Sequence, residues 1–255
     1  MRRGQFKVRI FIFLIVVAFA YLRKCSQEEV NPYTGKTQAI SLTPEEEMAI
    51  GLQSAPSMEQ QHGGLHPNPS YQAIVDKVGQ RLVDNSIAKE TPYEYDFNLL
   101  SDANTINAFA LPGGKIYITY ALYSKLENQD QLAGVLGHEI GHVLGKHSNE
   151  RITNANYWKV IAMGSSAIDL GSVAQQYGHG ELLKNGRDDE LESDALGIKF
   201  MIDAGYNPEE MIGVMEILKN AAGPNRIPEF QSTHPDPENR IEKIKEAIRQ
   251  YKNAP

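Results

Sequence analysis

The chain has 255 residues, 41% of them hydrophobic and 22% charged, which is enough to bury the core of one domain with short additions. Residues 1–24 contain six basic side chains and no acidic one, so the formal net charge of −7 for the whole chain corresponds to −13 for the rest. Because an acidic body repels a phosphate backbone, this composition argues against nucleic acid as a partner.

An uninterrupted apolar run, residues 10–22, follows the basic N-terminus and is typical of an export signal or a membrane anchor. The run is short for a spanning helix, and Ala18-Phe19-Ala20 matches a signal cleavage pattern. The apolar run nevertheless continues to Leu22, and Arg23 and Lys24 then follow as they would at a membrane edge. Cleaved signal and retained anchor therefore both stay open. Either one predicts a location in the bacterial envelope, on the periplasmic side.

Cys25 is the only cysteine, so no intramolecular disulfide can form. It lies where a lipoprotein would be acylated, but Arg23 and Lys24 occupy positions that need small residues, which favours an incidental thiol over lipidation. We expect residues 1–24 to be the signal or anchor, residues 25–42 a polar linker, and residues 43–255 the folded domain. Thr43 as N-cap and Pro44 at the first helical position predict where that domain's first helix begins.

A small sheet is expected before the central part of the chain. Residues 93–100 alternate between apolar and polar side chains, and residues 108–111 and 116–118 predict two further strands joined by Pro112-Gly113-Gly114. An exposed edge of this sheet can bind an extended peptide through backbone hydrogen bonds. The same sheet can equally be structural support, and the pattern does not choose between the two interpretations.

The most informative stretch is Leu136-Gly137-His138-Glu139-Ile140-Gly141-His142. On a helix, His138 and His142 lie on one face a turn apart, so both imidazoles can bind one metal ion. Glu139 can reach a water on that ion without being a ligand, which is the arrangement of a zinc peptidase. Apolar residues at helical spacing before and after the motif support a buried helix, in which two His and a Glu without a ligand would be costly.

A second polar motif lies on a predicted helix near residue 190. Its apolar positions share one face, and Glu190 and Asp194, four residues apart, share another. A catalytic zinc needs a third protein ligand, which Glu190 or Glu192 can supply, and Asp194 is placed to fix the tautomer of a ligand His. Before this helix, Gly178-His179-Gly180 and Gly186 predict a loop.

Four blocks of the sequence together resemble metallopeptidase family forty-eight. They are Asn-Ala-Phe-Ala-Leu-Pro-Gly-Gly at residues 107–114, His-Glu-Ile-Gly-His at 138–142, Arg187-x-x-Glu190-x-x-x-Asp194, and Thr-His-Pro at 233–235 with Arg240. The family includes the heat-shock protease HtpX, the CAAX prenyl endoprotease, the mitochondrial protease of the Oma type and periplasmic quality-control proteases. The resemblance covers roughly residues 42–251, and among its small departures is Ser193 where relatives usually have Ala.

The resemblance implies an α+β fold: a mostly helical zincin-type metallopeptidase domain, with a small antiparallel sheet bordering the active-site helix, preceded by one apolar N-terminal segment. It implies one Zn²⁺ per chain held by His138, His142 and Glu190, since the family's third ligand sits four residues before the Asp. Glu139 becomes the general base, and His234 either steadies the oxyanion or caps the zinc in a resting state. Asp194, Arg187 and Arg240 would support the ligands, and the strand that holds substrate would comprise Asn107, Ala108, Phe109, Ala110 and Leu111.

We therefore expect a zinc metalloendopeptidase that hydrolyses misfolded or unassembled envelope proteins, with a membrane partner if the N-terminal segment is retained. One alternative is an envelope chaperone or binding module whose zinc is latent because His234 fills the fourth position; the intact Glu139 argues against it. A weaker alternative is a zinc hydrolase that acts on non-peptide substrates. The sequence does not indicate an oligomeric state.

Overall fold

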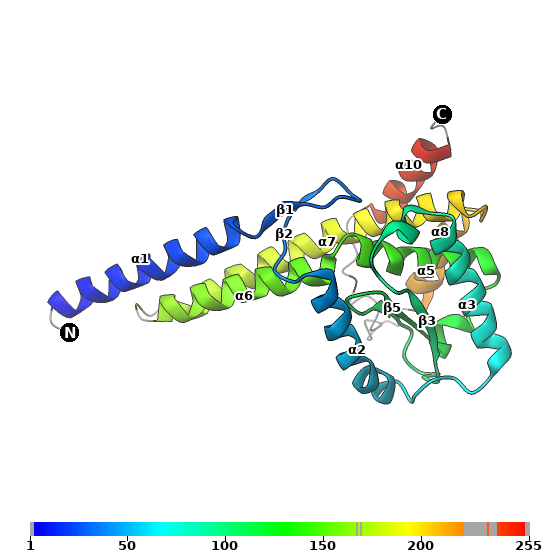
Figure 1. Cartoon of the computed structure of the whole chain (residues 1–255), viewed down its shortest axis with the longest axis horizontal. Helices are drawn as coiled ribbons and strands as arrows, with labels where there is room; N and C mark the ends of the chain where they lie inside the picture. The colour runs from blue at the N-terminus through cyan, green and yellow to red at the C-terminus, as the bar shows by residue number, and fades with distance from the viewer. Residues whose placement is uncertain (1–2, 167, 169, 222–233, 235–238, 253–255) are drawn as a thin grey trace. The chain divides into compact units, whose positions relative to one another are not determined.

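The computed structural model describes residues 3–166, 168, 170–221, 234 and 239–252 (Figure 1). The chain divides into two compact units. The first comprises Met1–Leu42 and Lys146–Gly186, and the second comprises Thr43–Gly145 and Arg187–Pro255. Helix α7 (Gly171–Asp203) contributes residues to both units. Thr233 and Pro235 of the fourth sequence block lie outside the described residues.

The first unit is built on helices α1 (Arg3–Cys25) and α6 (His147–Ser166), which lie side by side (Figure 1). They approach closely because Gly164 of α6 faces Phe13 and Val16 of α1. Within the described residues, no helix has both the length and the hydropathy that crossing a membrane requires. The stretch expected to be a linker contains an antiparallel hairpin, β1 (Glu28–Val30) with β2 (Thr37–Ala39).

The loop predicted around residues 178–186 is wrong, because α7 runs through it as continuous helix. Glycine inside a helix lowers helix stability by about 1 kcal/mol relative to Ala. It therefore predicts a break in the helix only where no tertiary packing offsets this loss. Here Gly178 is buried against Trp158, and a Cβ would come 2.7 Å from Trp158 Cγ. Close packing of α7 on α6 thus overrides the local preference at this glycine.

The second unit holds the remaining helices and the sheet. The N-terminus of α2 (Pro44–Gln61) has the predicted cap: Thr43 and Glu46 form a reciprocal capping box, with Thr43 N donating to Glu46 Oε2 at 2.8 Å. The other helices of the unit are α3 (Pro69–Asp84), η1 (Ile87–Glu90), α4 (Tyr120–Tyr123), α5 (Gln129–Leu144), α8 (Glu210–Ala221) and α10 (Arg240–Lys252).

The three predicted strands form one sheet in the order β3 (Asp96–Leu100), β5 (Lys115–Thr119), β4 (Ala108–Ala110). Strands β4 and β5 form the expected antiparallel hairpin, and Gly113 and Gly114 supply its positive φ angles of 86° and 107°. However, β3 pairs with β5 in parallel, so the sheet is mixed and not antiparallel as predicted. Alternating side chains reveal strands but not their spatial order, and the intervening β4 reverses the chain before β5.

The core of this unit lies between the sheet and the helices α3 and α5 (Figure 1). Leu99, Ile116 and Ile118 of the sheet and Leu136 and Ile140 of α5 are completely buried. Helix α5 is buried on nearly all sides, so its polar side chains His138 and Glu139 lie inside the protein. This burial fixes their positions.

Candidate metal centre

Helix α5 places the first two candidate ligands. Asn128 caps its N-terminus by accepting a hydrogen bond from Gln131 N at 2.9 Å, and the helix continues without interruption through His138 and His142. The two ring Nε2 atoms lie 3.0 Å apart, so both imidazoles point to the same place, as the four-residue spacing predicts. His138 is buried and His142 is partly buried.

Helix α7 approaches α5 closely enough to add a carboxylate. A Cβ on Gly141 would come 2.9 Å from Ser193 O, and one on Gly197 would come 2.9 Å from His138 N, so side chains larger than hydrogen do not fit. The glycines therefore allow the two helices to pack backbone against backbone. Glu190, one turn before Ser193, then reaches the histidines.

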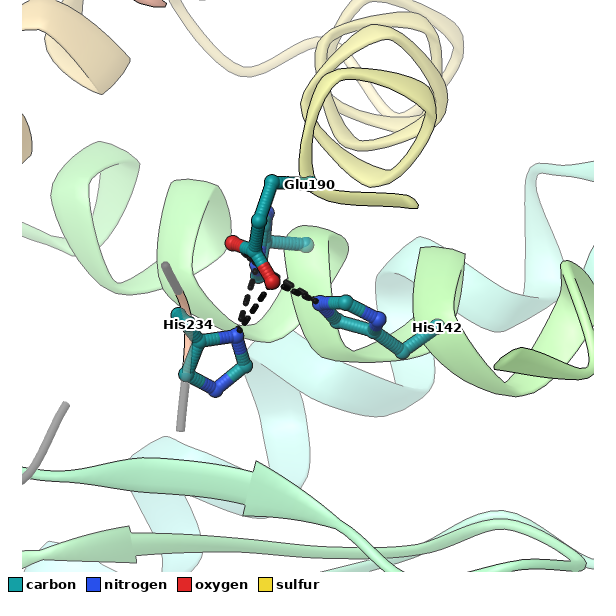
Figure 2. Close-up of side chains that lie close together, drawn as sticks. His142, Glu190 and His234 are labelled. Carbon is teal, nitrogen blue, oxygen red and sulfur yellow. Dashed lines mark hydrogen bonds and ion pairs between the residues drawn. The ribbon is translucent and has the colours of Figure 1, made fainter. Parts of the chain in front are cut away.

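Four side chains converge at one point (Figure 2). Glu190 lies 3.3 Å from His138 Nε2 through Oε2 and 3.3 Å from His142 Nε2 through Oε1. His234 Nδ1 lies 3.0 Å from Glu190 Oε1 and 3.4 Å from His138 Nε2. The structure thus brings together the three predicted ligands and His234, which comes from far along the chain.

These separations fit a shared metal ion. Four donor atoms arranged tetrahedrally at zinc's usual bond lengths would lie about 3.3–3.4 Å from one another. The five separations above run from 3.0 to 3.4 Å. Imidazole nitrogens and a carboxylate oxygen are donors that zinc accepts, so the residues present can hold such an ion.

Glu139 lies beside this cluster without taking part in it. Its side chain is completely buried, and within the described chain neither carboxylate oxygen has a hydrogen-bond partner. His234 Nε2 lies 3.7 Å from Glu139 Oε1. A buried carboxylate without a donor is costly, so its acceptor oxygens are available to a ligand or a water.

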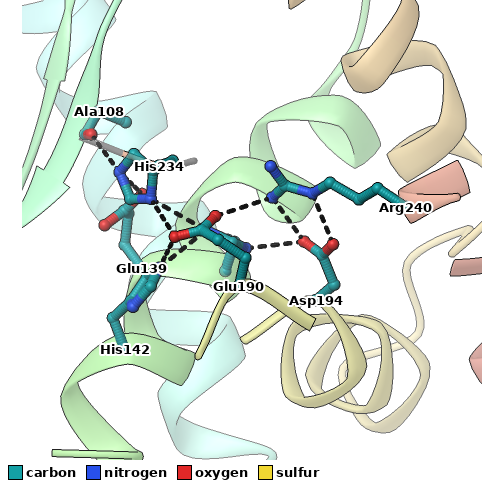
Figure 3. Close-up of polar contacts among 8 residues, drawn as sticks. Ala108, Glu139, His142, Glu190, Asp194, His234 and Arg240 are labelled. Carbon is teal, nitrogen blue, oxygen red and sulfur yellow. Dashed lines mark hydrogen bonds and ion pairs between the residues drawn. The ribbon is translucent and has the colours of Figure 1, made fainter. Parts of the chain in front are cut away.

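Two buried charged side chains, Asp194 and Arg240, form a network with the Nδ1 side of the His138 ring (Figure 3). Asp194 Oδ1 accepts from His138 Nδ1 at 2.8 Å, and the guanidinium of Arg240 donates to both Asp194 oxygens at 2.7 and 2.9 Å. Arg240 Nη2 also lies 3.2 Å from Glu190 Oε2. Because Nδ1–H of His138 is held by Asp194, Nε2 is the ring nitrogen that faces the cluster.

The ionisation of these groups follows from burial and charge. Burial alone would raise the pKa of Glu190, but its electrostatic interactions with His234 and His142 hold that pKa well below its ordinary value. Burial opposes protonation of His138, yet its hydrogen bonds with Asp194 and Glu190 raise the pKa of His138 to about 10. In Glu139 burial prevails and raises the pKa, although His234 and His138 oppose it. Without a metal, the cluster therefore holds a proton.

Two candidate residues, Arg187 and Glu192, are not among the side chains that converge on the cluster. Arg187 is exposed and is not brought to the cluster. Glu192, the competing third ligand, is absent from the group of four converging side chains. The selection of Glu190 over Glu192 agrees with this geometry.

The predicted substrate strand corresponds to β4 and its two neighbours. Asn107 O accepts from Thr119 N at 3.0 Å and Leu111 N donates to Lys115 O at 2.8 Å, so these backbone groups face β5. Because strand polarity alternates, the backbone groups of Ala108 and Ala110 point the other way. Consistent with this, Ala108 O lies 3.3 Å from His234 Nε2. The Phe109 ring stacks on Tyr117 at a centroid distance of 5.2 Å and belongs to the core.

Sequence reasoning did not single out the glycines that let α5 and α7 meet. Gly137 and Gly141 are four residues apart, as are Ser193 and Gly197, and this small-residue spacing on both helices is the signal that could have identified them.

Comparison with known proteins gives consistent matches. The model of peptidase family M48 matches residues 69–248. The beta-barrel assembly-enhancing protease of Escherichia coli O157:H7 is 31% identical over 190 residues, which are 68% of this chain and 38% of that protein. The mitochondrial metalloendopeptidase OMA1 of Schizosaccharomyces pombe is 29% identical over 185 residues, 71% of this chain and 53% of that protein. The chain thus spans about half or less of the length of these relatives.

Proposed function

The chain belongs to peptidase family M48, as the sequence motifs predicted, and from this premise we propose that it is a zinc-dependent metalloendopeptidase. One observation carries the proposal: His138, His142 and Glu190 converge within bonding reach of one ion, while the buried carboxylate of Glu139 lies alongside with no hydrogen-bond partner among the described residues. Three protein ligands and a nearby carboxylate are what metal-assisted peptide hydrolysis requires.

His138, His142 and Glu190 would hold the zinc. When bound, zinc supplies Lewis-acid chemistry, which makes water acidic enough to deprotonate near neutral pH and polarises a carbonyl group. Glu139 accepts the proton of the attacking water on its carboxylate and then delivers it to the leaving amine nitrogen. Its raised pKa, caused by burial, suits a group that both accepts and donates a proton.

Asp194 and Arg240 act as positioning residues. Asp194 fixes the tautomer of His138, and Arg240 neutralises Asp194 and part of the charge of Glu190. Second-neighbour hydrogen bonds of this kind orient a ligand and raise its basicity. The network holds the His138 ring with its Nε2 toward the cluster.

The substrate would add as an extended strand to the free side of β4. Within the described chain, β4 is an edge strand, and the backbone groups of Ala108 and Ala110 point away from β5. Binding through backbone hydrogen bonds depends little on side chains, which supports a broad class of unfolded polypeptides. We extend this to misfolded or unassembled envelope proteins, with the relatives' name, beta-barrel assembly-enhancing protease, as support.

His234 lies where this substrate would bind, next to the backbone of β4. Its Nδ1 occupies the position of a fourth ligand, and its Nε2 is at hydrogen-bond distance from Ala108 O, a group the substrate would use. Four protein donors make a closed site, so the arrangement corresponds to a resting state in which His234 caps the metal. Of the two roles considered for His234, capping is the one these contacts favour.

Degradation of casein by the purified, zinc-loaded chain tests the proposal. Glu139→Gln should retain zinc, measured by atomic absorption, and lose cleavage, whereas His138→Ala and Glu190→Ala should lose both. A Glu139→Gln protein that cleaves casein at the parental rate would refute the assignment of the base.

The same assay decides whether the closed site is latent. If His234 only caps the metal, His234→Ala should cleave casein faster than the parent while still binding zinc. If the protein is an envelope chaperone or binding module, the parent and His234→Ala should both hold zinc and neither should cleave. Slower cleavage by His234→Ala would contradict capping and support a role in catalysis.

A further inference from the structure

The exposed apolar side chains are concentrated in one unit of the protein. Of the large hydrophobic residues exposed in the described chain, all but Leu52 and Leu65 belong to the unit formed by Met1–Leu42 and Lys146–Gly186. Many come from α1, as its apolar sequence leads one to expect. Others, Met163, Leu170 and Val173, come from α6, from the turn after it and from the first part of α7. We call these three residues the hairpin tip.

Uncharged stretches of α1 and α6 lie beside each other in the first unit. Lys24 of α1 lies over the ring of Tyr157 in α6, 5.1 Å from its centroid, and Gly164 of α6 faces Phe13 and Val16 of α1. The two helices are therefore antiparallel. The uncharged residues 10–22 of α1 consequently lie beside residues 160–166 of α6, which are also uncharged, and between residues 160 and 180 the sequence has a single charged side chain, Asp169.

Basic and aromatic side chains mark one end of this apolar surface. Arg23 and Lys24 of α1 and Lys159 of α6 lie at the level of the Lys24–Tyr157 contact. Tyr157 packs against Trp158, whose ring centroid lies 5.3 Å from that of Tyr177 in α7. Basic residues next to a row of Tyr and Trp are typical of the boundary between the hydrocarbon and the headgroups of a bilayer.

The described polar groups at the end of α6 and just after it have hydrogen-bond partners within the first unit. The backbone amides of Ile168 and Leu170 both donate to Ser165 O at 3.0 Å, and the hydroxyls of Ser165 and Ser166 both donate to Ala162 O. These described polar groups are satisfied inside the hairpin, so lipid would not strip them of their partners.

We propose that this unit docks on an anionic lipid bilayer and that the hairpin tip enters the membrane together with α1. Positive charge at Arg23, Lys24 and Lys159 selects anionic headgroups, and the apolar side chains beyond it contact the acyl chains. The new element is the α6–α7 hairpin, since α1 alone would be expected to bind lipid from its sequence. The proposal rests on the first unit and is independent of the peptidase assignment.

Trp158 is the only tryptophan and reports directly on this docking. The full chain is mixed with vesicles of phosphatidylglycerol and phosphatidylethanolamine, or of phosphatidylcholine alone. On the anionic vesicles, Trp158 emission should shift to shorter wavelength and be quenched more by lipids brominated near the headgroup than by lipids brominated at the chain end. No shift on anionic vesicles, or equal binding to both kinds of vesicle, would overturn the proposal.

A matched pair of variants separates the hairpin from α1. The double variant Leu170→Gln, Val173→Gln should lower the partition coefficient about tenfold or more, because two side chains lose their contact with lipid. The control Leu52→Gln, Leu65→Gln changes two comparably exposed apolar residues in the other unit and should leave the partition coefficient unchanged. Equal partitioning of both double variants would show that α1 binds alone and refute the role of the hairpin.

The competing occupant is a second copy of the chain. Light scattering without lipid would then give a dimer that Leu170→Gln, Val173→Gln dissociates, and adding vesicles would leave Trp158 emission unchanged; that combination also overturns the proposal. Casein cleavage without lipid should be the same for this variant and the parent, so failure of membrane docking is distinguishable from failure of the peptidase.

Discussion

Asp194 is the residue on which the ligand geometry depends most, because it holds both His138 and Arg240. Asp194→Asn keeps the size of the side chain but removes the charge that Arg240 neutralises. We expect zinc affinity to fall by about 10- to 100-fold, measured by competition with a chelating dye. The control Glu192→Gln removes a carboxyl two residues away on the same helix. If Glu192→Gln lowers zinc affinity more than Asp194→Asn does, the ligand assignment is wrong.

Asp102 gives a prediction about pH at a site remote from the metal. Its Oδ1 accepts from the backbone amides of Asn104 and Thr105 at 2.8 and 2.9 Å, and its Oδ2 lies 3.1 Å from His62 Nδ1. Burial opposes ionisation, but the hydrogen bonds outweigh it and lower the pKa of Asp102 to about 2.

Since the folded pKa lies below the unfolded value near 3.8, ionised Asp102 stabilises the folded state above that value and the contribution is lost as pH falls toward 2. Asp102→Asn should therefore lower the free energy of unfolding by up to about 2 kcal/mol at pH 6 and by about half as much near pH 3. Urea unfolding of parent and variant at the two pH values measures this. A pH-independent difference would exclude the charge of Asp102 as its cause.

At the level of elements, the contact between α5 and α7 depends on glycine. A Cβ on Gly141 would lie 2.9 Å from the backbone oxygen and 3.0 Å from the Cα of Ser193, atoms that cannot move without shifting α7. Gly141→Ala should therefore destabilise the protein by about 1–3 kcal/mol, despite its better helix propensity, and weaken zinc binding by moving Glu190.

Gly180 is the matched control, because it is an exposed helical glycine with nothing within 4 Å of its Cβ position. Gly180→Ala should stabilise α7 by about 0.5–1 kcal/mol and leave zinc affinity unchanged. Both variants are compared by urea unfolding and metal titration. If Gly141→Ala is as harmless as Gly180→Ala, the close packing of α5 on α7 does not position the ligands.

At the level of the whole molecule, metal binding and folding should be coupled. The ligands come from α5, from α7 and from His234, so an ion that binds only the folded state joins parts that are far apart in the sequence. At a free zinc concentration 1,000 times the dissociation constant, the stabilisation would be about 4 kcal/mol. A chelator should then lower the melting temperature by about 8–16 °C.

The size of this shift should depend on pH. Without metal, protonated His138 stabilises the folded state below its unfolded pKa of 6.5, and that contribution is lost as pH rises toward the folded value of about 10. Zinc requires the deprotonated ring, so its affinity changes in the opposite sense. The difference between the melting temperatures with and without zinc should be larger at pH 9 than at pH 6.5. A constant difference would mean that no proton leaves the cluster on binding.

The sequence alone determined the local features of this protein. These features depend on neighbours within a few residues, so the sequence is sufficient to predict them. They are the capped start of α2, the β4–β5 hairpin, and the spacing of His138 with His142 and of Glu190 with Asp194. The motifs also indicated the family, which the match over residues 69–248 confirms.

The way in which these elements pack together became visible in the folded structure. The parallel pairing of β3 with β5, the continuation of α7 through Gly178 and the exposure of Arg187 follow from packing between distant segments, which local preference does not encode. The same holds for His234, whose place against Glu190 and Ala108 O had to be seen in space. Backbone geometry constrains residues that are close in sequence. Contacts between residues that are distant in sequence depend instead on how the buried side chains of the whole unit pack together.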